Sequence, residues 1–458
     1  MSSKIIIDPG VLSIDRIIKL NKTLNNQIIL ITAYQELLKK FKKKDKDVKI
    51  YLYPHISKKG KLPEIKNLKL NPVMVWQKII NDHQTFLLYD RSKFLPFSSS
   101  LKVSNIIEDV LRCIFWFEKM KPNYLIYMFM PHSLETWIFA RVSEFFGTKV
   151  LYFQSTILPW RLFFFEGIKK KPYLVKIKFN KKDKIKSESK ILSEFFTKKT
   201  GGTKNIMPKY ETDRLEKNNN KYFSFFKEIF RSWPRIDLFI NKFLCYYYYQ
   251  KIAQTKNLSD RYVIYFLHYN PERTTLPESF GFAQQYGAIS ALSMALPKNV
   301  KLYIKEHPSI FTYQCHWKER TRFWYKMINK LPNVKFIKME ENPYDLIDCS
   351  VCAATISGTT AVEAVLRNKK AVIFGNGPFN YLNTNLIHRY SNINDLKKFF
   401  IIKKSLNFDI SKYFNQIEDK THCGISTFNT FQEIEKNLEE VTHNAIFSGI
   451  DMFLTSKK

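Results

Sequence analysis

The chain has 458 residues, too many for one hydrophobic core, which predicts two or three domains. Hydrophobic residues make up 45% and aromatic residues 16%, a composition that excludes disorder throughout the chain. Lysine and arginine outnumber aspartate and glutamate by 74 to 41, giving a formal charge of +33. Such a surface attracts nucleic acid, anionic lipid or phosphorylated substrates, although a lysine-rich genome would also raise the count.

Six cysteines are scattered along the chain, so they do not form a disulfide framework. Cys349 and Cys352 make a lone CxxC in an apolar run, which predicts two buried structural thiols rather than a metal site. The N-terminal residues lack a signal-peptide core, and no apolar run reaches the roughly 18 residues of a membrane span. These features predict a cytoplasmic protein.

Residues 1–159 alternate between short apolar runs and helical patterns. The runs predict buried parallel strands, and they are KIIIDP, QIILITA, VKIYLYP, TFLLYD, NYLIYMFM and KVLYFQS. Helices are expected over 104–120, with Ser104 as N-cap, and over 133–146, where Ser133 and Thr136 offer caps and Gly147 ends the helix. This alternation predicts an open parallel α/β sheet.

The same alternation returns over 257–404 and predicts a second doubly wound sheet. Its expected strands are YVIYFLHY, VKLYIKE, VKFIKM, SVCAAT and AVIFG, and its expected helices cover 280–296, 315–330, 343–348 and 360–368. The predicted fold class is α/β, with two Rossmann-like doubly wound parallel-sheet domains facing a cleft. That layout is GT-B-like, and a helical tail is expected over 405–458.

Residues 160–256 interrupt this pattern. They contain a lysine run and then interleave aromatic residues with lysine and arginine, as in YFSFFKEIFRSWPRIDLFINKFLCYYYYQKIAQ. This composition predicts a basic aromatic insert or linker facing an anionic membrane surface. A core-packed aromatic helix with a solvated lysine face fits equally well. Single-stranded nucleic acid fits less well, because no RNP-like, helix-turn-helix or zinc-ligand pattern occurs.

Two of the strand ends expected in the second domain carry polar groups, and ligands of doubly wound sheets bind beyond such ends. Glu272 and Arg273 follow the first strand, and an arginine can pair bidentately with a phosphate or carboxylate. His307 and Pro308 follow the second, where the proline favours an extended backbone that presents the imidazole. A histidine can donate a hydrogen bond or a proton to a phosphate.

A third strand end carries the run ISGTTAVEAV. Gly358 permits a tight turn before a helix, whose N-terminus offers backbone N–H groups to a phosphate, with hydroxyls from Ser357 and Thr359 beside them. Thr360 and Glu363 fit a capping box. Taken singly, the three strand ends are consistent with an ordinary loop, turn or cap. Their joint placement predicts one nucleotide site.

Several of these stretches resemble the capsule polysaccharide biosynthesis family, which includes the capsule Kdo transferases. They are LHYNPERTTLPESFGF, LPKNVKLYIKEHP, NPYDLIDCSVCAATISGTTAVEAVLRNKKAVIFG and, for the family's N-terminal domain, PNYLIYMFMPHSLETWIFARVSEFFGTKVLYFQS. The resemblance implies a GT-B-like fold and a nucleotide-sugar donor. It implies donor contacts by His307 with Pro308, by the turn Ser357, Gly358, Thr359 and Thr360, and by Glu363, and its matched run includes Lys305.

The resemblance also implies a carboxylate from the cleft as the catalytic base. The candidates are Glu272, Asp8, Asp90 and Glu135, and we favour Glu272, with His132 also lining the cleft and His307 stabilising the departing phosphate. We expect no metal and no cofactor other than the sugar donor.

We therefore expect a metal-independent glycosyltransferase of bacterial surface polysaccharide, peripheral at the inner face of the cytoplasmic membrane. It would transfer a sugar, with CMP-Kdo favoured as donor, to a glycan or lipid-linked acceptor of capsule, O-antigen or lipopolysaccharide. A glycerophosphotransferase or a UDP-sugar epimerase on the same scaffold is the alternative among enzymes. A basic non-catalytic protein that binds nucleic acid or membrane is the alternative from another class.

Overall fold

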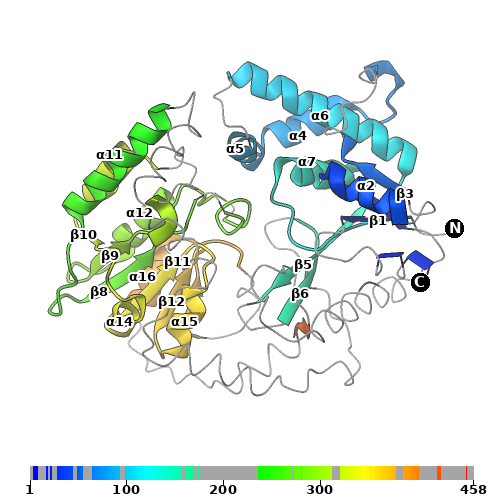
Figure 1. Cartoon of the computed structure of the whole chain (residues 1–458). Helices are drawn as coiled ribbons and strands as arrows, with labels where there is room; N and C mark the ends of the chain where they lie inside the picture. Colours follow the sequence, from blue (N-terminus) through cyan, green and yellow to red (C-terminus); the bar gives the residue numbers. More distant parts are fainter. Residues whose placement is uncertain are drawn as a thin grey trace. The chain divides into compact units, whose positions relative to one another are not determined.

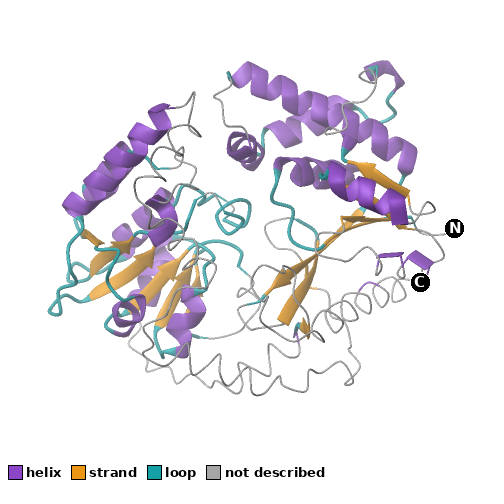
Figure 2. Cartoon of the chain, viewed as in Figure 1, coloured by secondary structure: helices purple, strands orange, loops and turns teal. Residues whose placement is uncertain are grey.

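The structure is a computed structural model of the chain (Figure 1). It describes residues 4–8, 17–18, 21–22, 28–44, 49–54, 64–92, 98–156, 161–168, 173–174, 236–270, 272–279, 281–311, 320–377, 385–401, 420–423 and 450. The chain divides into two compact units, one from Met1–Ser189 and Glu418–Lys458, the other from Lys190–Ile417. Each contains one sheet with helices packed against it (Figure 2).

The sheet of the first unit has the strand order β14-β6-β5-β4-β1-β2-β3, with β7 paired to β6. Strands β1 to β5 pair in parallel, and β6 runs antiparallel to β5. Their bounds are β1 (Ile5–Asp8), β2 (Ile28–Thr32), β3 (Lys49–Leu52), β4 (Tyr124–Tyr127), β5 (Lys149–Ser155), β6 (Arg161–Glu166), β7 (Tyr173–Leu174) and β14 (His422–Cys423). The order 3-2-1-4-5 of the parallel strands is that of a Rossmann-like sheet.

The helices of this unit are α2 (Gln35–Lys44), α4 (Pro72–Ile80), α5 (His83–Ser92), α6 (Ser99–Met120) and α7 (Leu134–Ser143), with the 3-10 turns η1 (Ile65–Asn67) and η2 (Glu144–Phe146). The expectation of a strand at TFLLYD was wrong, because this run lies in α5. Its buried residues Gln84, Thr85, Leu88 and Tyr89 recur at helical spacing and so form one face of a helix.

The helix expected over 104–120 begins earlier, at Ser99. The hydroxyl of Ser98 accepts the backbone N–H of Leu101 and is the N-cap, whereas Ser104 donates back to the Ser100 carbonyl. The caps expected at Ser133 and Thr136 are confirmed, since the two residues form a capping box at the start of α7.

The second unit has an all-parallel sheet in the order β10-β9-β8-β11-β12-β13. Its strands are β8 (Tyr262–Phe266), β9 (Lys301–Lys305), β10 (Val334–Ile337), β11 (Cys352–Thr355), β12 (Lys370–Ile373) and β13 (Ile387–Arg389). Numbered along the chain, this order is 3-2-1-4-5-6, that of a Rossmann fold, with its topological switch point between β8 and β11. The predicted class of two Rossmann-like doubly wound domains is thus confirmed, and the cleft between them stays a prediction.

Helices cover both faces of this sheet: α11 (Ile236–Ile252), α12 (Tyr286–Ala295), α13 (Arg322–Asn329), α14 (Pro343–Asp348), α15 (Thr360–Leu366) and α16 (Ile393–Ile401), with the 3-10 turn η4 (Pro308–Phe311). One core joins α11, α12, α13 and α16 to alternate residues of the strands, such as Val263 and Tyr265. Helices α12 and α13 begin later than expected, and residues 315–319 of the second expected helix lie outside the described residues.

Parts of the expected insert and tail belong to the sheets and cores of the two units. From 160–256, β6 pairs with β5 in the first unit, and Cys245 and Tyr249 of α11 are buried in the core of the second. From 405–458, β14 pairs with β6, and Ile450 lies in the core of the first unit. The rest of the dense lysine run, 169–172 and from 175 on, lies outside the described residues. The three boundaries between the four expected segments, after residues 159, 256 and 404, stay predictions.

Of the two cysteines expected to be buried, only Cys352 is buried. Cys349 is exposed because it ends α14 as its C-cap, one turn before β11 begins. Among the described helices none is long and apolar enough to cross a bilayer.

Candidate functional site

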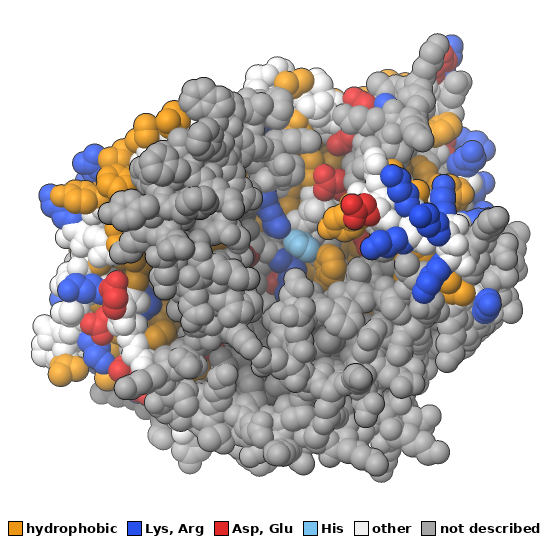
Figure 3. All heavy atoms as spheres, in the orientation of Figure 1, with side chains coloured by type: hydrophobic (Ala, Val, Ile, Leu, Met, Phe, Trp, Pro, Cys, Tyr) orange, Lys and Arg blue, Asp and Glu red, His pale blue; other side chains and the backbone are white. Residues whose placement is uncertain are grey.

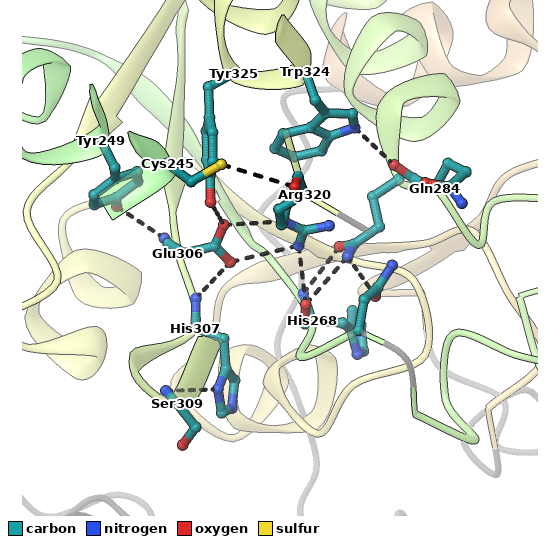
Figure 4. A network of polar contacts seen from close by, with 12 residues as sticks. Cys245, Tyr249, His268, Gln284, Glu306, His307, Ser309, Arg320, Trp324 and Tyr325 are labelled. Atoms are coloured by element: carbon teal, nitrogen blue, oxygen red, sulfur yellow. Dashed lines mark hydrogen bonds and ion pairs between the residues drawn. The ribbon is translucent and has the colours of Figure 1, made fainter. Parts of the chain in front are cut away.

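The candidate site lies at the carboxyl edge of the second sheet, around the switch point between β8 and β11. Three loops leave the sheet there: 267–285 after β8, 306–311 after β9 and 356–359 after β11. A network of buried polar side chains connects these loops, and Figure 4 shows the part around Glu306 and His268. Polar groups in an apolar interior are costly unless they are paired, so such a network fixes the loops in one arrangement.

His268 joins the loop after β8 to the loop after β11. Its Nε2 lies 2.8 Å from Oγ1 of Thr355 and 3.4 Å from the backbone N–H of Ser357. Burial, together with the charge of Arg320, lowers the pKa of His268 to about 4. The ring is therefore neutral at physiological pH, and Nε2 accepts hydrogen bonds while Nδ1 carries the proton.

Gly358 lies directly against this histidine. A Cβ at position 358 would lie 2.8 Å from Oγ1 of Thr355 and 3.1 Å from Cε1 of His268. The same Thr355 hydroxyl accepts the backbone N–H of Gly358 at 3.2 Å. The glycine is thus required by the close approach of its backbone to the buried pair below it.

The backbone of His268 is held by Gln285, a fully buried residue with a left-handed backbone, φ 58°. Its Oε1 accepts the N–H of His268 at 2.9 Å, and its Nε2 donates to the His268 carbonyl at 3.2 Å and to Asn270 Oδ1 at 2.9 Å. An amide side chain here replaces a neighbouring strand, pairing with the backbone of the first residues beyond β8.

Glu306 and Arg320 form the centre of the network. Arg320 Nε lies 3.2 Å from Glu306 Oε2, and Nη2 of the same guanidinium donates to the His268 carbonyl at 3.1 Å. Glu306 also accepts the phenolic O–H of Tyr325 at 2.6 Å and the backbone N–H of His307 at 2.9 Å. Figure 4 shows these contacts meeting at the Glu306 carboxylate. The pair therefore connects the end of β8 to the end of β9.

His307 extends from this centre and is partly exposed. Its Nδ1 accepts the backbone N–H of Ser309 at 3.2 Å, and its ring centroid lies 5.8 Å from that of Tyr269. With Nδ1 used as an acceptor, the neutral ring carries its proton on Nε2, which makes Nε2 a donor. Pro308 opens η4, a position that suits proline because its missing N–H is not needed there.

The loop after β8 places Glu272 and Arg273 at the same edge. Glu272 Oε2 accepts the hydroxyl of Thr274 at 3.1 Å, and Arg273 Nε lies 2.9 Å from Oε1 of Glu278. Burial raises the pKa of Glu278 to about 7 in spite of the opposing charge of Arg273. Arg273 is about a quarter exposed, so the pair has one buried and one accessible member.

The turn after β11 is bound to this loop through Ser357, whose hydroxyl donates to the Thr274 carbonyl at 2.8 Å. The capping box expected from Thr360 and Glu363 was wrong. The N-cap is Thr359, without a side-chain cap, and its hydroxyl instead lies 3.4 Å from Oε1 of Glu363. The reason is that α15 begins one residue earlier than the box requires, at Thr360 itself.

Lys305, the last residue of β9, is buried at this edge. Burial lowers its pKa to about 8, against the opposing charges of Glu340, Glu306 and Glu341. Glu340 and Glu341 follow β10, the strand that pairs with β9.

The remaining predicted residues lie in the first unit. Asp8 ends β1, and its Oδ2 accepts the O–H of Tyr53 at 2.7 Å. His132 follows β4, with Nδ1 3.0 Å from the Met130 carbonyl. Both belong to strand ends of the first sheet, as expected.

Asp90 and Glu135 have other positions. Asp90 lies in α5 and pairs with Lys102 at 2.7 Å. Glu135 lies in the first turn of α7, where a carboxylate stabilises the helix dipole.

The structure thus brings Glu272, Arg273, Lys305, His307, Ser357, Gly358 and Glu363 to one edge of one sheet or the helix after it. The sequence reading missed His268, Gln285, Glu278 and Arg320, which hold that edge together. Two of these had a signal in the sequence, since His268 and Glu278 lie within the stretch LHYNPERTTLPESFGF. Nothing in the local pattern marks Gln285 or Arg320.

Groups of three or more His, Cys, Asp or Glu side chains that could hold a metal do not occur in the part of the chain that the structure describes. No family model and no curated protein matches the sequence.

Among solved structures, the chain is similar to two Kdo transferases of Thermosulfurimonas dismutans and to an epimerase. The β-Kdo 2,7-transferase of KpsC is 8% identical over 98% of this chain and 99% of that one, with a TM-score of 0.32. The β-Kdo 2,4-transferase is 13% identical over 66% and 82%, with a TM-score of 0.30. The UDP-GlcNAc 2-epimerase of Methanocaldococcus jannaschii is 10% identical over 92% and 98%, with a TM-score of 0.26. Similarities this low carry no inference about chemistry, so the fold assignment rests on the strand order itself.

Proposed function

We propose that the chain is a nucleotide-sugar-dependent glycosyltransferase of surface-polysaccharide synthesis, with the donor bound at the carboxyl edge of the second sheet. One observation carries the proposal. Three loops that are separate in sequence meet at the switch point of a Rossmann-like sheet, and the buried residues His268, Glu306 and Arg320 lock them together. The switch point is where sheets of this kind bind nucleotides.

The chemistry follows from the groups at that edge. In the transfer, an acceptor hydroxyl forms a bond to the anomeric carbon while the bond from that carbon to the phosphate oxygen breaks. Negative charge grows on the departing phosphate, and the guanidinium of Arg273 and the Nε2–H of His307 would stabilise it. The backbone turn at Gly358 and Thr359 would approach the same phosphate. A carboxylate, for which we favour Glu272, would take the acceptor proton.

The donor and acceptor are proposed from the sequence resemblance. It favours a CMP-sugar such as CMP-Kdo as donor and a glycan or lipid-linked acceptor. In this proposal His132 of the first unit lines the acceptor side, the reaction needs no metal, and the enzyme works at the inner face of the cytoplasmic membrane.

A thermal-shift panel of CMP, CDP, UDP and GDP tests the proposal. A ligand that binds only the folded chain stabilises it by about 2.7 kcal/mol at a hundredfold excess over its Kd. We expect CMP to raise the unfolding temperature most. Stabilisation by none of the four would overturn the proposal, and stabilisation by UDP alone would favour the epimerase-type alternative. The variant Arg273→Gln should lower the response to whichever nucleotide binds.

A further inference from the structure

Helix α11 is apolar on two opposite faces. On its inner face Cys245 and Tyr249 are fully buried in the core of the second unit. On its outer face Phe243 and Tyr247 are 62% and 67% exposed. Large exposed hydrophobic residues recur along this face at helical spacing: Ile236, Ile240, Phe243, Leu244, Tyr246 and Tyr247. A surface helix normally turns polar residues to the solvent, so an apolar outer face indicates an interaction surface.

The neighbouring helix α13 extends this surface. The two helices pack against each other, and the guanidinium of Arg322 lies over the ring of Tyr248 at 5.8 Å. Beside it, Phe323 is 70% exposed. We name the outer residues of the two helices the α11–α13 face. In Figure 3, hydrophobic and basic side chains gather along the edge where Figure 1 places α11.

The α11–α13 face has a basic border. Lys251 near the end of α11, Arg322 and Lys326 in α13 and the C-cap of α13, Lys330, are all exposed. Asp237 is the one exposed acidic residue among the positions of these two helices, which the structure describes throughout. Exposed aromatic rings among lysine and arginine are the composition that binds at the surface of an anionic bilayer.

We propose that the α11–α13 face docks on a lipid bilayer that carries anionic headgroups. The charge decides between this partner and a second copy of the chain. An isologous dimer would bring the same four cations face to face in a chain whose formal charge is already +33. Anionic lipid instead neutralises the border while the rings enter the interface.

This inference rests on the proposed function only for the location at a membrane. It adds the surface of the chain that would bind that membrane. Its evidence is independent of the nucleotide site, because no residue of the outer face was assigned to the donor. The two proposals can therefore fail separately.

Flotation of the full chain with vesicles tests the proposal. We expect binding to vesicles of phosphatidylcholine mixed with phosphatidylglycerol, and weaker binding to phosphatidylcholine alone or at high salt. The variant F243S/Y247S/F323S should bind the mixed vesicles at least about tenfold more weakly than the wild type, because three aromatic rings leave the interface. The control L258S/M294S removes two other exposed hydrophobic residues of the second unit and should bind as the wild type does.

Equal vesicle binding by the triple variant and the wild type would overturn the proposal, as would equal binding to neutral and anionic vesicles. Light scattering adds a third decisive outcome: a wild-type dimer that the triple variant converts to monomer would assign the face to a second copy. The nucleotide panel on the triple variant separates the two proposals. A preserved thermal shift with lost vesicle binding supports docking at this face, and a lost shift with preserved vesicle binding overturns it.

Discussion

Glu306 and Arg320 form an ion pair that is shut off from solvent, with side chains 0% and 1% exposed and Nε 3.2 Å from Oε2. Glu306 fixes the backbone N–H of His307, and Arg320 fixes the carbonyl of His268. A buried ion pair is a costly element, because both charges lose their hydration. Its position between two strand ends indicates that it orients the loops. Through the Glu306 contact it holds the backbone of His307, whose side chain is partly exposed.

Removing one charge of this pair should be strongly destabilising. In Glu306→Gln the guanidinium of Arg320 stays buried without its counter-charge, and we expect a loss of about 3–5 kcal/mol in the free energy of unfolding. Urea titration measures it. The double variant E306Q/R320M should recover part of the loss, since it leaves no unpaired charge.

The matched control is an exposed pair of the first unit. Lys66 and Glu64 lie 3.1 Å apart with side chains 79% and 65% exposed, so Glu64→Gln should change stability by less than about 1 kcal/mol. If Glu306→Gln costs no more than Glu64→Gln, the pair does not hold the site together.

Replacing His307 should affect nucleotide affinity without affecting stability. We expect His307→Ala to weaken binding by roughly ten- to a hundredfold, the value of one hydrogen bond to a charged group. His307→Gln keeps an N–H donor and should recover part of the affinity. Titration calorimetry with the nucleotide that gives the largest thermal shift measures both.

His83, an exposed histidine of α5 in the first unit, provides the control. The variant His83→Ala should bind nucleotide as the wild type does. An unchanged affinity in His307→Ala would remove this imidazole from the site.

The sheets and their strand ends could be predicted because buried parallel strands are local apolar runs. The same reasoning failed at TFLLYD, where a short apolar run is a helix whose buried residues Gln84, Thr85, Leu88 and Tyr89 follow helical spacing. A run of six residues fits the period of a strand and that of a helix, and only the packing of α5 against α4 and α7 distinguishes the two.

The supporting residues of the site could not be predicted, because they act over long sequence separations. Arg320 reaches back to His268 across 52 residues, and His268 reaches Thr355 across 87. At Glu363 the sequence instead predicted a contact that the structure does not contain. A local capping pattern was present, but Thr359 rather than Thr360 precedes the helix. Local patterns locate strand ends, whereas the contacts between those ends depend on the tertiary fold.

Adding one methyl group to Gly358 should disrupt the site. Its Cβ would lie 2.8 Å from Thr355 Oγ1, closer than real contacts allow, and 3.1 Å from His268 Cε1, so we expect the turn to move. Because Ser357 and Thr359 move with it, we expect Gly358→Ala to reduce nucleotide affinity by more than about tenfold. The assay is the same calorimetric titration.

Gly287 offers a matched substitution elsewhere in the unit. It lies in α12, and a Cβ there meets only the Phe282 ring at 3.5 Å, an ordinary contact. Since alanine favours helix over glycine by up to about 1 kcal/mol, Gly287→Ala should be neutral or stabilising and should bind normally. Equal affinity in the two variants would show that the turn at Gly358 does not contribute to binding.

His268 should make the fold sensitive to acid in a defined window. Its pKa is about 4 in the folded chain, against about 6.5 in the unfolded chain. Between these values the unfolded chain binds a proton that the folded chain does not, so stability falls as the pH drops from about 6.5 to about 4. The difference of roughly 2.5 pKa units amounts to about 3 kcal/mol over the window.

Glu278 acts in the opposite direction, and this allows the two contributions to be separated. Its pKa is about 7 when folded, so between about 4.5 and 7 the folded chain holds a proton that the unfolded chain has lost, and stability rises as the pH falls. Chemical unfolding at a series of pH values should therefore show a nearly flat wild type across the overlap from about 6.5 to 4.5. As the pH falls across this range, the free energy of unfolding of His268→Gln should rise, and that of Glu278→Gln should fall. Parallel pH profiles for the wild type and His268→Gln would show that His268 is not held neutral by burial, and with it the buried connection between β8 and β11 would lose its basis.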